Sequence, residues 1–389
     1  MNFKHFIIES QEEEKQLKHL EHAEDHVINA GHEGFAHAYS NLKDVHDQLT
    51  GKKNDTRVTI KYDGSPAVIF GRHPENGKFF VASKSVFNKN PKLNYSEEDI
   101  ERNHGHAPGL VHKLKAALKH LPKVTPSEGV YQGDIMHTKG DVHVSGGHAH
   151  FTPNTLTYSV PQDSDHGKAA QNSHIGVAVH TAYHGKKLED MEAEYAPNLD
   201  LFEKHDDVHM MSTNHDLGKL DYSQEAQAKF KKHLLAAHEI YKNTPADHYD
   251  SLNGHQVPLK TYINHTVRTG SEPSVDDFIQ HYNNSHEKLI NKVKTEKSKE
   301  AKRQKRDAAI GHVRTNREHF QNVLDMHKHL QHAKNVLTDT MSNNTEFKHS
   351  ISGNASKPEG FVVVKKNRPT KFVDRNEFSA ANFNRDKSL

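Results

Sequence analysis

Strand-like segments occur in this chain in two groups that lie far apart in the sequence, and this spacing limits how it can fold. Alternating β-branched residues fill TRVTIKYDGSPAVIFGR, GKFFVASKSVF and VYQGDIM, and two more strand-like segments follow before residue 185. Between 220 and 345, apolar residues recur every three or four positions, as in amphipathic helices. Strand character then returns in EGFVVVKKN and, more weakly, in KFVDR. We therefore expect an α+β core on antiparallel sheets, interrupted by a large helical insertion.

This pattern divides the chain into four expected segments. They are an N-terminal helical segment (1–52), the first part of the core (53–219), the helical insertion (220–345), and a core completion with a C-terminal tail (346–389). In the first segment, Gly31 and Gly51 are expected to end two helices. In the core, a helix is expected over 96–121 with Ser96 as its N-cap. The last residues, NEFSAANFNRDKSL, are expected to form a short closing helix or a tail.

Composition narrows the class of protein. The chain has 389 residues with a formal net charge of +1, so any electrostatic footprint for a partner must be local. It contains no cysteine, which excludes disulfides and thiolate chemistry. No apolar run approaches the roughly 18 residues that span a bilayer, and the acidic start does not resemble a signal peptide. We expect a soluble cytoplasmic protein without a membrane partner, in the host cytoplasm if the chain is viral.

Histidine is unusually frequent, with 36 residues. Metal binding is one interpretation, but the histidines are scattered, and neither HExxH nor CxxC occurs. His148 and His150 are expected on one face of a strand, with no third ligand nearby. A surface bias is the simpler interpretation, and it makes the net charge rise as pH falls through histidine titration.

The segment Lys61-Tyr62-Asp63-Gly64 carries the pattern with the clearest chemical meaning. It places a lysine at the end of a β-branched strand, and Asp63 and Gly64 then make a turn. Burial and nearby cations help such a lysine to lose its proton, and the neutral amine can attack phosphorus to form a covalent intermediate. Alone, the pattern is weak, because an Asp-Gly turn after a lysine is common in hairpins.

Three later segments supply further charges in a fixed order. VYQGDIM places Asp134 after a glycine, KPEGFVVVKKN places Glu359 before a glycine and three valines, and PTKFVDR supplies Lys371. Together with KYDG, this series resembles the covalent nucleotidyltransferase superfamily of ATP-dependent DNA ligases, RNA ligases and mRNA capping enzymes. From about residue 20 to 375, the layout also looks like an uncharacterised group of tailed-phage proteins, some labelled ligase-like.

The resemblance implies a role for each matching residue. Lys61 would attack the α-phosphate of ATP, release pyrophosphate and become lysyl-AMP. Asp134 and Glu359 match acidic positions that contact the ribose and hold Mg²⁺, and Lys371 or else Lys365 matches a lysine that binds the α-phosphate. The nucleotide-binding set implied in this way is Asp63, Gly64, Lys84, Asp134, Glu359, Lys365 and Lys371. Cations and carboxylate-held Mg²⁺ are what an amine needs when it attacks a polyanion.

Other features of the family match less directly. Its base-stacking aromatic is expected on a strand, with Tyr158, His180 and Tyr183 as candidates and core packing as the alternative for each. Pro66 stands where many ligases have arginine, while Ser65 suits the RNA ligases. Few residues follow the last motif, so we expect no terminal OB-fold domain of the kind found in DNA ligases.

The insertion contains a basic segment, HEKLINKVKTEKSKEAKRQKR, which suits contact with a phosphate backbone. The candidate contacts are Lys299, Lys302, Arg303, Lys305 and Arg306. The alternative is a solvated helix with acid–base pairs such as Glu296–Lys299, since no aromatic residue is interleaved for base stacking.

These observations predict an ATP-dependent, RNA-like polynucleotide ligase. It would use ATP and Mg²⁺, form lysyl-AMP at Lys61 and seal a 5′-phosphate to a 3′-hydroxyl on RNA or a nicked duplex. Two alternatives stay open. One is another nucleotidyl transfer, either a GTP-using, capping-like reaction or protein AMPylation. The other is a phage structural or interaction protein that kept the fold without the activity. The sequence leaves the oligomeric state open.

Overall fold

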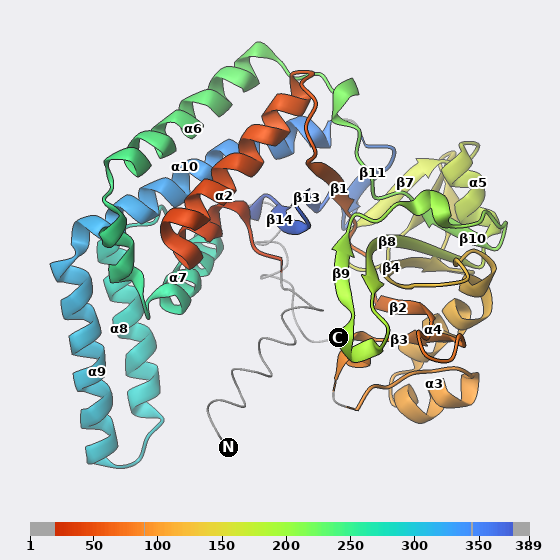
Figure 1. Cartoon of the computed structure of the whole chain (residues 1–389), viewed down its shortest axis with the longest axis horizontal. Helices are drawn as coiled ribbons and strands as arrows, with labels where there is room; N and C mark the ends of the chain where they lie inside the picture. The colour runs from red at the N-terminus through yellow and green to blue at the C-terminus, as the bar shows by residue number, and fades with distance from the viewer. Residues whose placement is uncertain (1–19, 89, 344, 376–389) are drawn as a thin grey trace. The chain divides into compact units, whose positions relative to one another are not determined.

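The structure, a computed structural model, describes residues 20–88, 90–343 and 345–375 (Figure 1). Within them, helices and mainly antiparallel sheets mix, as predicted for an α+β protein. The described elements fall into two units, each assembled from segments distant in the sequence. The first unit contains 55–216 and 342–369, and the second contains 21–54, 217–341 and the residues from 370. The N-terminal helical segment and the insertion, expected as separate segments, therefore share one unit.

The first unit is built on a six-stranded sheet in the order β10-β8-β4-β2-β3, with β9 also paired to β8 (Figure 1). The strands are β2 (Ala67–Arg72), β3 (Phe79–Ala82), β4 (Val130–Thr138), β8 (Ile175–His184), β9 (Glu192–Tyr195) and β10 (Val208–Met211). Every pair is antiparallel except β10 with β8. The central strands β4 and β8 are buried along most of their length, although β4 carries the polar residues Gln132, Asp134 and His137.

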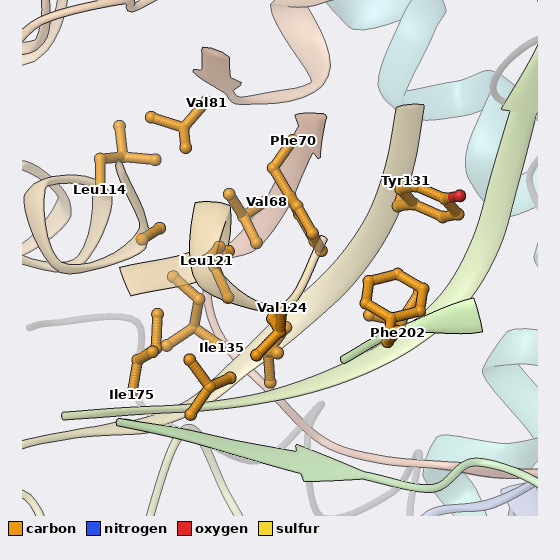
Figure 2. Packing of buried hydrophobic residues seen from close by; sticks show 14 of the residues in the cluster. Val68, Phe70, Val81, Leu114, Leu121, Val124, Tyr131, Ile135, Ile175 and Phe202 are labelled. Carbon is orange, nitrogen blue, oxygen red and sulfur yellow. The ribbon is translucent and has the colours of Figure 1, made fainter. Parts of the chain in front are cut away.

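One face of this sheet packs on α3 (Glu97–His104) and α4 (Pro108–His120). Figure 2 shows Leu114 of α4 beside Val81 of β3, and Val68, Phe70 and Ile135 of the strands belong to the same cluster. Each side chain of this kind contributes about 1.5–3 kcal/mol when it is fully buried, so this face is the main hydrophobic core of the unit.

The two helices α3 and α4 occupy the stretch where one helix was expected. Ser96 caps α3 as predicted, and it forms a reciprocal capping box with Asp99. The helix ends at His104, before Gly105. Pro108 then opens α4, because proline lacks the N–H that a helix interior needs but fits the first turn.

The strand that carries the KYDG motif belongs to a separate, three-stranded sheet, β1-β13-β14. β1 (Arg57–Lys61) pairs with β13 (Gly360–Lys365) in antiparallel register, from Arg57 opposite Val364 to Lys61 opposite Gly360. The sequence predicted instead that this strand forms a hairpin with the following one. Residues 62–66 in fact connect two different sheets, and the pairing of β1 with β13 brings Lys61 beside the residue that precedes Gly360.

A third sheet of five strands completes the first unit, in the order β12-β11-β7-β6-β5. Its strands are β5 (His143–Ser145), β6 (His148–Phe151), β7 (Thr157–Pro161), β11 (Lys348–Ile351) and β12 (Asn354–Ser356). The short helix α5 (Asp165–Asn172) packs on β6, β7 and β10. Phe151, Tyr158 and Phe347 form an aromatic cluster in this part of the unit.

The second unit is helical. It comprises α2 (His26–Leu49), α6 (Gln224–Asn243), α7 (Gln256–Thr269), α8 (Val275–Asn291), α9 (Glu296–Thr315) and α10 (Arg317–Ser342). Gly31 does not end a helix as predicted. It kinks α2 with a φ of +51°, a conformation that glycine adopts without strain.

The apolar periodicity between 220 and 345 predicted helices there, and α6, α7, α8, α9 and α10 occupy this stretch. No helix among the described residues combines the length and apolar character needed to cross a membrane. The last strand, β14 (Arg368–Phe372), begins three residues before the expected KFVDR segment. The closing helix or tail expected from NEFSAANFNRDKSL lies outside the described residues.

Candidate functional site

Lys61 is the last residue of β1, and its ammonium group forms an ion pair with the Glu359 carboxylate. The antiparallel register explains the contact, because Gly360 lies opposite Lys61 and Glu359 precedes it. The Lys61 side chain is 26% exposed and that of Glu359 is 12% exposed. The nucleophile expected from the sequence is thus held at a strand end without being sealed from solvent.

Asp134 lies on β4, on the sheet face opposite the helices α3 and α4. Its backbone neighbours are Ala67 on β2 and Ala178 on β8, so small side chains flank it on both sides. Burial raises the pKa of Asp134 to about 6, and this effect outweighs the lowering by Lys61 and Lys84, while Asp63 adds to the rise. Asp134 therefore lies within electrostatic reach of both lysines but is not fully neutralised by them.

Lys84 reaches the same group from a 3₁₀ turn rather than from the strand on which it was expected. β3 ends at Ala82, and the Ser83 hydroxyl then caps the turn by accepting a hydrogen bond from the Ser85 N–H. Lys84 is exposed, and its charge lowers the pKa of Asp134 and that of His180.

His180 joins the group through a β-bulge in β8. Gln132 of β4 pairs with Thr181 and Gly133 pairs with Val179, so His180 is the extra residue. Its Nε2 lies 3.8 Å from an Asp134 oxygen, and its Nδ1 lies 2.8 Å from the Thr181 hydroxyl. Burial, reinforced by Lys61 and Lys84, lowers the pKa of His180 to about 4, so the ring is neutral at pH 7. Periodicity alone gives no sign of such a bulge.

We call Lys61, Lys84, Asp134, His180 and Glu359 the Lys61 cluster. They come from β1, the turn after β3, β4, β8 and the residue before β13, and all belong to the first unit. Two ammonium groups, two carboxylates and one neutral imidazole are thereby brought together. This set can bind a phosphorylated anion and hold a hard cation such as Mg²⁺, which prefers one or two carboxylates plus phosphate oxygens.

Asp63 has a different environment from that expected of a nucleotide-binding residue. It is 6% exposed, and its carboxylate accepts hydrogen bonds from Asn154 Nδ2 at 2.8 Å and from two backbone N–H groups. Those N–H groups belong to Thr155, at 2.7 Å, and Leu156, at 2.9 Å. Asp63 therefore anchors the turn to the loop before β7. Its sequence position gave no hint of these partners, which lie more than 90 residues away.

Gly64 is required by a close approach between the turn and β4. A Cβ atom placed on Gly64 would lie 2.4 Å from the Asp134 Cβ and 2.8 Å from the Met136 sulfur. The Ser65 N–H and the Pro66 carbonyl also bond to the backbone of Ile135. Gly64 therefore matters because its missing side chain lets the turn approach β4, and not because it touches a ligand.

Tyr62 and Lys113 hold the turn from other sides. The Tyr62 hydroxyl donates to the Ser212 carbonyl at 3.1 Å, just after β10. The Lys113 ammonium, on α4, donates to the Ser65 carbonyl at 2.6 Å, and burial lowers its pKa. Lys113 was missed because a lysine on an amphipathic helix is usually solvated, and no motif marks it.

One of the two predicted phosphate-binding lysines, Lys365, lies away from Lys61. Lys365 follows Val364, which pairs with Arg57, so it lies at the opposite end of β13 from Gly360. The expectation for Lys365 is therefore corrected, since strand register separates it from Lys61. Lys371 belongs to the second unit, where its backbone N–H donates to the Glu21 carbonyl at 2.7 Å.

The candidate aromatic residues are also separated by the structure. Tyr158 is 1% exposed, and its hydroxyl accepts a hydrogen bond from the Asp63 N–H. Tyr183 is 2% exposed and donates to Gln132. Both therefore pack in the core, and His180 is the one of the three candidates that joins the Lys61 cluster.

The basic residues of α9 are largely paired with acids on neighbouring turns. Lys299 binds Glu296 at 2.8 Å, and Arg306 binds Asp307 at 2.8 Å and also Glu287. Arg303 lies 3.4 Å from Glu300. Lys302 and Lys305 lie close enough to His286 to lower its pKa, after the larger effect of burial. These contacts are those of a solvated helix, the alternative interpretation of the segment.

A second charged group lies in the helical unit. Among the described residues, Glu24, Asp25 and His327 have ligand atoms close enough together for a metal ion. Lys334 already binds Glu24 at 2.7 Å, and Arg375 binds both Asp25 oxygens at 2.8 and 2.6 Å. We call these five residues the Lys334 cluster. Its two cations already balance its two carboxylates, which leaves no charge for a metal to neutralise.

Comparison with known proteins identifies a family whose function is unknown. A family model described as "Family of unknown function (DUF6267)" matches residues 17–387. No curated protein and no solved structure matches the chain.

Proposed function

Because the chain belongs to DUF6267, a family of unknown function, we propose its activity from the Lys61 cluster: ATP-dependent nucleotidyl transfer through a covalent lysyl-AMP at Lys61. The observation that carries the proposal is the ion pair of a strand-end lysine with Glu359, beside a second carboxylate and a second lysine. Carboxylates whose pKa is raised by burial beside specific charge partners, as that of Asp134 is, cluster at functional sites.

The first step needs only Lys61 and ATP as reactants. The neutral Lys61 amine attacks the α-phosphorus of ATP, a nitrogen–phosphorus bond forms, and the bond from the α-phosphorus to the bridging oxygen breaks to release pyrophosphate. The Lys61 ammonium gives one proton to solvent before the attack, and the attacking nitrogen passes a second proton to the Glu359 carboxylate as the new bond forms. Glu359 holds and orients Lys61, and Lys84 offsets the phosphate charge.

Asp134 and Glu359 are the residues that would hold Mg²⁺. The cation, when bound, neutralises phosphate charge and favours the departure of pyrophosphate. A carboxylate with a pKa near 6 gains from a divalent partner, because the partner offsets the cost of burying its ionised form. His180, neutral and turned toward Asp134 by the bulge, is our candidate for contact with the base or ribose.

The acceptor that we propose is a 5′-phosphate of nucleic acid, on RNA or at a nick. The AMP moves from Lys61 to that phosphate, and a 3′-hydroxyl then attacks the activated phosphate, seals the strand and releases AMP. This part rests on the order of the KYDG, QGD and EGFVVVK segments, which resembles that of the polynucleotide ligases.

Labelling separates the candidate functions. The full chain is incubated with Mg²⁺ and either ATP or GTP labelled at the α-phosphate, and the label that stays on the denatured protein at neutral to alkaline pH is measured, because a nitrogen–phosphorus bond hydrolyses in acid. We expect label from ATP that is lost in Lys61→Ala and kept in the control Lys186→Ala, an exposed lysine of the same unit. Label from GTP alone indicates a capping-like reaction. Absence of label with both nucleotides contradicts the proposal and favours a structural role.

A sealing assay then tests the acceptor. Pre-labelled protein is offered 5′-phosphorylated single-stranded RNA or a nicked duplex. Transfer of the label to the nucleic acid, followed by joined product, supports a ligase. Label that moves only to a second protein identifies protein AMPylation instead.

A further inference from the structure

Three histidines and a glutamate form a chain of hydrogen bonds in the first unit, separate from the Lys61 cluster. His137 Nε2 lies 3.0 Å from His209 Nδ1, and His209 Nε2 lies 2.8 Å from His166 Nδ1. His166 Nε2 in turn lies 2.8 Å from a Glu346 oxygen. His137 is 1% exposed and the Glu346 side chain is 72% exposed, so this histidine chain leads from solvent to a buried imidazole.

Glu346 fixes the direction of the chain, because an ionised carboxylate only accepts hydrogen bonds. His166 Nε2–H therefore donates to Glu346, and His166 Nδ1 accepts from His209 Nε2–H. His209 Nδ1 then accepts from His137 Nε2–H. The last atom, His137 Nδ1, is left with a lone pair, and it is buried without a hydrogen-bond partner.

Burial keeps His137 and His209 neutral at pH 7 and makes the chain sensitive to acid. A proton enters most readily at His137 Nδ1, since a charge on His209 would turn both its nitrogens into donors and break its bond with His137. Burial lowers the pKa of His137 to about 4, although Asp141 opposes the shift. Burial, together with His137 and His166, also holds the pKa of His209 well below its usual value.

The elements that carry the chain also support the 61–64 turn. On β4, Met136 directly precedes His137, and its sulfur lies against Gly64. Just after β10, which carries His209, the Ser212 carbonyl accepts the Tyr62 hydrogen bond.

The outer end of the chain has a similar link to the turn. Phe347, next to Glu346, packs against the rings of Tyr62 and Tyr158. The Tyr158 hydroxyl accepts the Asp63 N–H. The charged group facing His137 is Asp141, and the one facing His166 is Glu346, which also acts on Tyr62. The neighbouring ring of Phe151 is uncharged.

We propose that the histidine chain is an acid-sensitive support for the turn that follows Lys61. At neutral pH it ties β4, β10, α5 and the segment before β11 together beside that turn. Protonation places a positive charge in the buried part of the unit and loosens these elements. The inference concerns folding and the position of the turn, and it holds whether or not Lys61 takes a nucleotide.

Stability against pH gives the first test. The unfolded chain binds protons at its histidines near pH 6.5, whereas His137 resists until about pH 4, so stability falls as pH drops through this window. His137→Gln keeps an N–H donor toward His209 and does not titrate. Relative to their values at pH 7.5, the thermal midpoint of the wild type at pH 5 should fall roughly 5 °C further than that of His137→Gln.

His184→Gln is the matched control, because this histidine lies in the same unit with its side chain 65% exposed. It should lose as much stability at pH 5 as the wild type does. An equal loss for wild type and His137→Gln overturns the proposal.

Nitrogen NMR of the wild-type imidazoles gives a second test, which remains valid if His137→Gln does not fold. At pH 7.5, His137, His209 and His166 should all carry the proton on Nε2. A proton on Nδ1 of His137 or His209, or titration of either residue near pH 6.5, contradicts the chain.

Discussion

The Lys61 cluster and the Lys334 cluster contain similar groups in opposite circumstances. In the Lys334 cluster, Lys334 and Glu24 are both fully buried and lie 2.7 Å apart, and Arg375 binds Asp25 with two parallel hydrogen bonds. In the Lys61 cluster, the Lys61 side chain is 26% exposed and faces one carboxylate directly, while Asp134 has no ammonium within ion-pair distance among the described contacts. The first arrangement is closed, whereas the second leaves Asp134 without an ion-paired ammonium among the described contacts.

The pKa values of the carboxylates in the two clusters differ in the same way. Burial opposes the ionisation of Glu24, but Lys334, His22 and Arg375 outweigh it and lower the pKa of Glu24 to about 2. For Asp134 the balance is reversed, since burial wins over Lys61 and Lys84 and raises the pKa to about 6. In a cluster that stabilises a fold, each charge is balanced by another charge of the cluster. In a cluster that binds a ligand, part of the balancing charge comes from the ligand.

The largest expected effect separates the charge of Lys61 from its nucleophilicity. Lys61→Arg keeps a cation beside Glu359, so the free energy of unfolding should change by less than about 1 kcal/mol. Arginine stays protonated and cannot attack phosphorus, so the covalent label from ATP should disappear completely. Denaturant unfolding and covalent labelling, read on the denatured protein at neutral to alkaline pH, measure the two effects. Label retained in Lys61→Arg would exclude Lys61 as the nucleophile.

The Lys334 cluster should respond in the opposite way. Lys334→Met removes one partner of a fully buried ion pair and leaves the Glu24 charge uncompensated, which costs about 3–5 kcal/mol. Denaturant unfolding of the full chain should show this loss, while labelling of the folded protein persists. Lys186→Met, at an exposed position, serves as the control and should change stability by less than about 0.5 kcal/mol. A neutral Lys334→Met would show that the buried pair does not stabilise the unit.

Gly64→Ala tests the contact between the turn and β4. The added methyl group overlaps the Asp134 Cβ and the Met136 sulfur, so we expect a loss of about 1–3 kcal/mol. Displacement of the turn should also slow labelling by roughly tenfold or more. The control is Gly109→Ala on α4, where no atom lies within 4 Å of the added carbon. Equal labelling rates for the two variants would refute the role given to Gly64.

The smallest effect concerns Asp134, and its sign is unusual. Because the pKa of Asp134 is raised in the folded chain, the ionised carboxylate destabilises the fold above pH 6. Asp134→Asn should therefore stabilise the protein by about 1–2 kcal/mol at pH 8 while it abolishes labelling. The stability difference should vanish below about pH 3, where the carboxyl is protonated in both states. A destabilised Asp134→Asn at pH 8 would show that the carboxylate is neutralised in the folded chain.

Local sequence pattern predicted much of the first unit, because β-strands can be recognised from alternating apolar residues and from β-branched side chains. The segments carrying Lys61, Asp134 and Glu359 were identified as strands or strand ends, and the structure brings these three residues to one place. The cap at Ser96 was predicted correctly for the same reason, since a cap depends on residues only a few positions away.

What the sequence did not reveal depends on distant partners. The hydrogen bonds of Asp63 reach residues 154–156, and the extra residue at His180 follows from the register with β4. Lys365 was placed in the site by its position in a motif, but antiparallel pairing carries it to the far end of β13. The grouping of 21–54 with the insertion likewise depends on packing and buried ion pairs, which periodicity cannot specify.

The central claim is that Lys61 becomes covalently bound to a nucleotide, and peptide mapping by mass spectrometry tests it most directly. The full chain is incubated with ATP and Mg²⁺, denatured, digested and searched for peptides that carry one added AMP. We predict a single modified peptide, with AMP on the side chain of Lys61 and none when Mg²⁺ is withheld. AMP on another residue, or unmodified peptide covering Lys61 under all conditions, would contradict the account.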